Sequence, residues 1–177
     1  MHGHNGQLAS LYEEVYARPD DDELRRVLAD ALLALGDPRG ELIQMQLNPT
    51  LDYQRRAMRL LQQHGLAWTG SLRGVVIPLA YERGFLAACQ VLDGTNDTVG
   101  ALEWATVHTI ELATRQIGFL SDPVMRSLRC VQKVRRDQLG EIGAIAQLRT
   151  MVTTGGETIE RGGNGHWRYP AELADDD

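Results

Sequence analysis

Hydrophobic residues follow a helical period over the first 64 residues of the chain. They recur at positions i, i+3, i+4 and i+7, and the period breaks at Pro19, Gly36, Pro49 and Gly65. The pattern therefore predicts four short helices, over residues 8–18, 20–36, 37–48 and 51–64. In the second helix the predicted buried stripe consists of Leu24, Val27, Leu28, Ala31, Leu32 and Leu35.

Two acidic starts support these helix boundaries. The run Asp20-Asp21-Asp22 supplies N-cap and first-turn carboxylates, where free backbone amides and the helix dipole favour negative charge. Asp37-Pro38 restarts the chain, because aspartate is a good N-cap and proline is well tolerated at the first helical position. Consecutive aspartates lack the alternating ligand spacing of a calcium loop, so we interpret both runs as caps.

From Phe85 onward the period changes to about 20 residues. The strand-like motif L-x-x-L-x-L occurs four times in degenerate form, at intervals of 21, 21 and 20 residues. This spacing lies in the lower range of leucine-rich repeats, in which neighbouring strand-plus-helix units share one core. The four copies begin at Leu86, Val107, Leu128 and Leu148.

Two positions weaken the repeat. Lys133 and Thr153 stand where apolar residues are expected to face the core. We therefore predict an α+β (mixed α/β) fold, in which an N-terminal helical subdomain precedes a short degenerate leucine-rich-repeat-like strand/helix array. The expected divisions are a helical domain over 1–70, the array over 71–157, and a C-terminal tail over 158–177 that could form a hairpin before becoming disordered.

The strand positions that alternate with the buried ones predict an open face. Among its candidate residues only Glu111 is charged, and a nearly uncharged surface suits protein contact better than phosphate contact. The alternative is that Trp167 and Tyr169 of the tail, or a second copy of the chain, cover this face. The candidate partner-binding residues are Gln90, Leu92, Thr109, Glu111, Gln132, Val134, Thr150 and Val152.

Charge and compartment narrow the class of partner. The 177 residues carry 18 basic and 24 acidic side chains, a net charge of -6, which disfavours a generic nucleic-acid binder. The segment 126–149 nevertheless holds a local excess of positive charge. No apolar stretch is long enough to cross a bilayer, and two cysteines without a secretion signal are typical of a reduced cytoplasmic protein.

Sequence motifs of common catalytic and metal sites do not occur in the chain. We find no C-x-x-C, H-E-x-x-H, G-x-S-x-G or G-K-[ST] motif. The Gly-rich segment 162–165 lacks the lysine and the following helix of a phosphate loop, and is better interpreted as a turn. We therefore predict no enzyme activity, no cofactor and no metal site.

One long segment resembles a bacterial family. Residues 18–47 read R-P-D-D-D-E-L-R-R-V-L-A-D-A-L-L-A-L-G-D-P-R-G-E-L-I-Q-M-Q-L, and resemble the bacterial repeat-companion domain. The segment 64–72 and the triplet Arg83-Gly84-Phe85 are similar to the linker and the turn of that family. Ala31 is a departure, because members often carry tryptophan after the Ala-Asp pair. The resemblance covers residues 8–92 well and the later repeats in general style.

The resemblance implies a binding module without catalytic residues, since this domain accompanies leucine-rich-like repeats in bacterial proteins. The leading hypothesis is a non-catalytic protein–protein interaction module that binds through its strand face. A narrower version is an immunity protein or inhibitor that neutralises a toxin or protease. A third hypothesis, from another class, is a nucleic-acid-associated regulator that uses the segment 126–149. The oligomeric state stays open.

Overall fold

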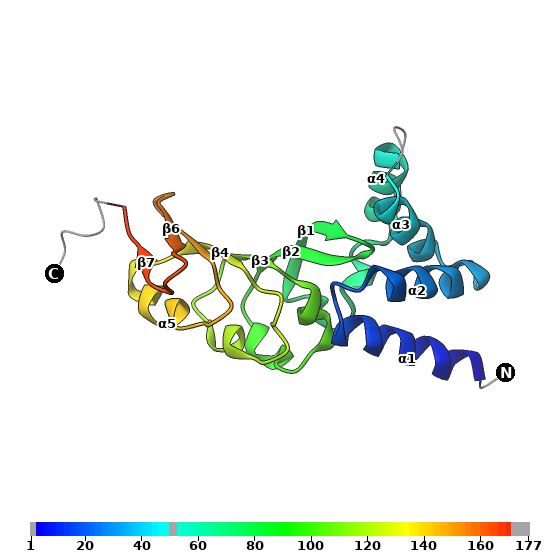
Figure 1. The fold of residues 1–177 in the computed structure, drawn as a ribbon, viewed down its shortest axis with the longest axis horizontal. Coiled ribbons are helices and arrows are strands. Elements are labelled where there is room, and N and C mark those ends of the chain that lie inside the picture. The colour runs from blue at the N-terminus through cyan, green and yellow to red at the C-terminus, as the bar shows by residue number, and fades with distance from the viewer. Residues whose placement is uncertain (1–2, 50–52, 171–177) are drawn as a thin grey trace.

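A computed structural model describes residues 3–49 and 53–170 of the chain. The N-terminal helices lie at one end of an elongated molecule, and a seven-stranded sheet with its connecting segments forms the rest (Figure 1). The α+β class with an N-terminal helical region is therefore confirmed. The helices are α1 (Gly3–Ala17), α2 (Asp22–Ala34), α3 (Pro38–Leu47) and α4 (Tyr53–His64).

Helix boundaries follow the predicted caps. Asp21 accepts a hydrogen bond from the Leu24 amide at 3.1 Å, and Asp37 accepts one from the Arg39 amide at 2.8 Å. Pro38 occupies the first turn of α3, where its missing amide hydrogen has no consequence. Residues 51–52 of the predicted fourth helix lie outside the described residues.

The buried face of α2 differs from the predicted stripe. Val27 and Leu35 are 52% and 54% exposed, so their prediction as core residues is wrong. The buried residues are instead Arg25, Leu28, Ala29 and Leu32. Arg25 points inward although hydrophobic periodicity does not predict a charged residue there. The buried face of α2 is therefore rotated away from Val27.

The sheet continues in sequence order from one edge to the other. Strand β1 pairs antiparallel with β2, the strands β2, β3, β4 and β5 run parallel, and β6 and β7 return to antiparallel pairing. Each of the four predicted repeats contains one of the parallel strands. The bounds are β1 (Val76–Glu82), β2 (Phe85–Val91), β3 (Thr109–Leu112), β4 (Cys130–Val134), β5 (Thr150–Thr153), β6 (Thr158–Arg161) and β7 (Trp167–Arg168).

Short helical turns connect the parallel strands and close the core behind the sheet. Trp104, Phe119 and Leu120 come from these turns and are buried with Cys89, Ile110 and other inward strand residues in one cluster. Neighbouring repeats therefore share this core, as stacked units must when each is too small to bury its own apolar side chains. The helices between the parallel strands are η2 (Thr95–Thr98), η3 (Leu102–Thr106), η4 (Gly118–Ser121), η5 (Arg136–Gln138) and α5 (Leu139–Gly143), while η1 (Ala67–Leu72) links α4 to β1.

A local bulge in β4 accommodates the irregular Lys133. Lys133 has φ +57°, and the pairing of β4 with β5 shifts register between Val131 and Val134. Its side chain is consequently exposed, whereas Val134 is fully buried in the core. The prediction that Val134 lies on the open face is therefore wrong, because the bulge shifts the alternation by one residue.

The described part of the tail closes the end of the array. Trp167 on β7 donates from Nε1 to the Gly143 carbonyl at 3.0 Å, and the Arg161 guanidinium lies 4.7 Å from the Trp167 ring centre. Arg161 also donates to the carbonyls of Gly143, Ile145 and Ala146. Trp167 therefore packs against the core behind the sheet, not across the open face. The predicted disorder beyond residue 170 lies outside the described residues.

Candidate partner-binding face

The open face of the sheet consists of side chains in register across the parallel strands. Ala88, Thr109, Cys130 and Thr150 align in one row, since Ala88 pairs with Thr109, Thr109 with Cys130, and Cys130 with Thr150. A second row contains Gln90, Glu111 and Gln132, and Ile77 of β1 pairs with Gln90 at its edge. We call these rows, together with Val152, the open face.

Seven of the eight predicted residues lie at or beside this face. Leu92 follows the end of β2, and the other six lie within strands; all seven are half-buried, with part of each side chain open to solvent. Val134 is the exception already described. Stacked parallel strands bring these side chains together although they are about 20 residues apart in sequence. The seven are Gln90, Leu92, Thr109, Glu111, Gln132, Thr150 and Val152.

Glu111 organises the polar centre of the open face. Its Oε1 accepts a hydrogen bond from Gln90 Nε2 at 2.6 Å and lies 2.5 Å from Lys133 Nζ. The hydrogen bond from the Lys133 ammonium lowers the pKa of Glu111, against a smaller opposing effect of desolvation. The single charged residue predicted for the face is thus neutralised by a lysine that the sequence assigned to the core.

The sequence pattern did not predict the exposed apolar side chains at one edge of the sheet. Ile77 and Leu79 on β1 are 45% and 55% exposed, and β1 itself was not predicted as a strand. Its edge position and its bulge near Leu79 explain why Pro78 is tolerated there. The available signal was an apolar run that leads into Arg83-Gly84, a pair that suits a tight hairpin turn.

A buried polar junction joins the array to the helices. Arg25 and Arg39 place their guanidinium carbons 4.6 and 4.4 Å from the centre of the Phe85 ring. Arg25 donates to the Pro19 and Arg83 carbonyls, and Arg39 Nε donates to the Gly84 carbonyl at 2.8 Å. Burial, and next the neighbouring Arg83 charge, lower the pKa of Arg25 to about 10, so it remains charged at neutral pH.

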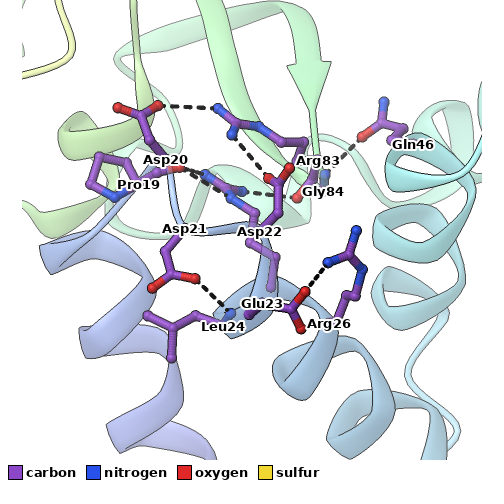
Figure 2. Close-up of polar contacts among 11 residues, drawn as sticks. Pro19, Asp20, Asp21, Asp22, Glu23, Leu24, Arg26, Gln46, Arg83 and Gly84 are labelled. Carbon is purple, nitrogen blue, oxygen red and sulfur yellow. Dashed lines mark hydrogen bonds and ion pairs between the residues drawn. The ribbon is translucent and has the colours of Figure 1, made fainter.

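Figure 2 shows how the turn between β1 and β2 is held against the helices. The Arg83 guanidinium pairs with Asp22 at 3.1 Å and Asp20 at 3.4 Å, while the Gly84 amide donates to Gln46 Oε1 at 2.7 Å. Gln46 Nε2 also donates to the Tyr81 carbonyl at 2.8 Å. Part of the acidic run therefore binds the turn, a contact beyond the predicted capping role. This cluster is called the turn junction below.

Two other groups were considered as sources of chemistry. His108 Nε2 lies 3.2 Å from Glu82 Oε1, a contact that joins the residue before β3 to the end of β1 and that sequence spacing did not predict. Cys89 is buried, which raises its pKa to about 12, and burial also raises the pKa of the half-buried Cys130. Among the described residues, no three histidine, cysteine or carboxylate side chains are grouped to hold a metal ion.

A hollow of about 710 Å³ lies at the carboxyl ends of the parallel strands. Its lining includes Arg115, Lys133 and Arg135 together with Asp93. Lys133 is paired with Glu111, and Arg135 is paired with Asp137 through contacts of 3.0 and 3.1 Å. Much of the positive charge at this edge is therefore balanced internally.

Comparison with known proteins gives no match to a family model, a curated protein or a solved structure. Within residues 3–49 and 53–170, no helix is long and apolar enough to span a membrane. The functional proposal therefore rests on the residues of this chain.

Proposed function

We propose that this protein is a non-catalytic interaction module that binds a protein partner through the open face. The carrying observation is a continuous, half-buried surface of small and uncharged side chains, bordered on β1 by the exposed Ile77 and Leu79. Glu111 is neutralised by Lys133, so burying the face under a partner leaves no unpaired charge at its centre. Apolar and amide side chains of this kind suit the desolvated centre of a protein interface.

We further propose that the N-terminal half is a bacterial repeat-companion domain that acts in the cytoplasm. The residues carrying that resemblance, Arg25, Arg39 and Gln46, converge on the similar Arg83-Gly84 turn. These contacts support a structural role for the motif, because they join the helices to the first strands of the array. The two free thiols accord with a reduced compartment.

The immunity-protein or inhibitor hypothesis is a narrower form of the same proposal and differs only in the identity of the partner. It requires one tight partner encoded nearby. The nucleic-acid hypothesis requires a different surface, the basic segment 126–149, and affinity that falls steeply with salt. We favour the protein partner because the one charged residue of the open face, Glu111, is paired with Lys133, and because Arg135 of the basic segment is likewise paired, with Asp137.

To test the proposal, the partner is first captured from the source organism. The affinity of the purified partner for this protein and for its variants is then measured. The face variant carries Thr109→Arg and Val152→Arg, which place two cations on half-buried positions of the open face without disturbing the Glu111–Lys133 pair. We expect the variant to lose binding by about 100-fold or more, since two unpaired charges would be desolvated.

A matched control adds the same charge elsewhere. Val99→Arg and Ala144→Arg alter exposed positions in the connecting segments between strands. We expect this control to bind like the unmodified protein, and both variants to retain the thermal midpoint of the original. Equal affinity of the face variant and the unmodified protein would refute the proposed surface.

A further inference from the structure

Five of the six basic residues in the segment 126–149 separate into two groups, at opposite ends of the parallel strands; the sixth is Arg136. Lys133 and Arg135 lie at the carboxyl ends of the strands and are paired with Glu111 and Asp137. Arg126, Arg129 and Arg149 lie at the amino-terminal edge and are exposed. Within the part of the chain that the structure describes, none of these three arginines forms an ion pair with a carboxylate.

The repeat aligns two of these arginines, Arg129 and Arg149, with His108. His108, Arg129 and Arg149 each directly precede a parallel strand, β3, β4 and β5 respectively. The Arg129 amide donates to the His108 carbonyl at 2.9 Å, and the Arg149 amide donates to the Arg129 carbonyl at 2.8 Å. Adjacent members are therefore separated by one strand spacing, about 4.8 Å.

Hydrogen bonds to backbone carbonyls orient two of the guanidinium groups. Arg129 Nη1 donates to the carbonyls of Arg126 and Leu128 at 2.7 and 2.9 Å, and Arg126 Nη1 donates to the Ala17 carbonyl at 3.1 Å. Each of these guanidinium groups keeps further N–H donors, because a guanidinium has five. Arg126, Arg129 and Arg149 are called the basic edge below; it directly borders the open face at Cys130 and Thr150.

We propose that the basic edge binds an extended acidic segment of the protein partner, with carboxylates at alternate positions. This inference rests on the proposed function and names the chemistry of one part of the partner. Alternate side chains of an extended peptide repeat at about 6.7 Å, and flexible arginine side chains can bridge the difference from the strand spacing. Guanidinium groups also match carboxylates in a bidentate geometry.

Two observations favour an acidic peptide over a nucleic acid. The three arginines of the basic edge precede only two neighbouring strands, β4 and β5, which lie about 4.8 Å apart, and this width is short for tracking a phosphate backbone. The chain as a whole carries a net charge of -6, which repels a long polyanion beyond that edge.

Fluorescence anisotropy with a synthetic peptide tests the inference separately from the natural partner. The probe is a labelled peptide of about ten residues in which glutamate alternates with serine, measured at about 50 mM salt, where exposed ion pairs are least screened. We expect measurable binding that weakens about fivefold in the variant Arg129→Gln/Arg149→Gln, as loss of two exposed ion pairs implies.

The matched control is Arg55→Gln/Arg59→Gln, which removes two exposed cations from α4 and changes the net charge equally. We expect this control to bind the peptide like the unmodified protein. The inference is overturned if no peptide binding is seen, if both variants lose affinity equally, or if single-stranded DNA of equal charge binds more tightly through the same arginines. None of these results bears on the open face, which the Thr109→Arg/Val152→Arg variant tests independently.

Discussion

Replacing Gly84 with alanine tests how closely the turn between β1 and β2 packs against α3. Gly84 has φ +80°, and a Cβ atom built there would lie only 2.1 Å from Ile43 Cγ1. Ile43 is fully buried, so it has little room to move. The substitution therefore combines a strained backbone with a steric clash inside the turn junction.

The magnitude follows from these two contributions. A left-handed conformation costs an L-residue about 1–2 kcal/mol, and overpacking a well-packed core costs about 1–3 kcal/mol. We expect Gly84→Ala to lower the free energy of unfolding by about 2–5 kcal/mol. The displaced turn would also weaken the hydrogen bonds that the Gly84 amide and carbonyl make with Gln46 and Arg39.

Urea unfolding followed by circular dichroism measures the loss, with Gly74→Ala as the matched control. Gly74 has φ +95°, but a Cβ atom there meets nothing within 4 Å. The control should therefore lose only the backbone contribution, about 1–2 kcal/mol. If the two variants unfold at the same urea concentration with equal slopes, the turn is not packed against Ile43 as described.

Further predictions concern buried and paired groups. Arg39→Ala should lower the unfolding free energy by about 2–4 kcal/mol, through the lost charged hydrogen bond and ring contacts, whereas Arg55→Ala should change it by under about 0.5 kcal/mol in the same urea assay. The hydrogen bond from Lys133 lowers the pKa of Glu111 in the folded protein from its usual 4.5, so the ionised carboxylate stabilises the fold above that pH. This stabilisation should be lost as the pH falls through the lowered pKa, and the Glu111→Gln variant should not show this loss in an acid titration. Thiol titration at pH 8 should modify Cys130 before Cys89, and simultaneous modification would contradict their different burial.

Local chemistry explains why much of the fold could be predicted from sequence. Asp37-Pro38 specifies a helix start through a cap and a preset φ, and the structure begins α3 at Pro38. The repeat spacing likewise located the four parallel strands, because inward residues such as Ile110, Val131 and Met151 must all reach the shared core.

The failures arise where tertiary contacts override a local pattern. Arg25 faces inward because backbone carbonyls and the Phe85 ring, distant in sequence, supply its partners. Val134 faces inward because Lys133 adopts a positive φ that periodicity does not encode. For the candidate site, sequence alternation found most of the open face, but it could not show that Lys133 pairs with Glu111 across two strands.

Alkylation of Cys130 in the presence of the purified partner tests the central proposal most directly. Cys130 lies between Thr109 and Thr150 on the open face, whereas Cys89 is buried in the core and serves as an internal reference. If the partner covers this face, a saturating amount should slow Cys130 modification by about tenfold or more, as expected for a thiol buried in an interface. An unchanged rate in the fully formed complex would show that the partner binds elsewhere.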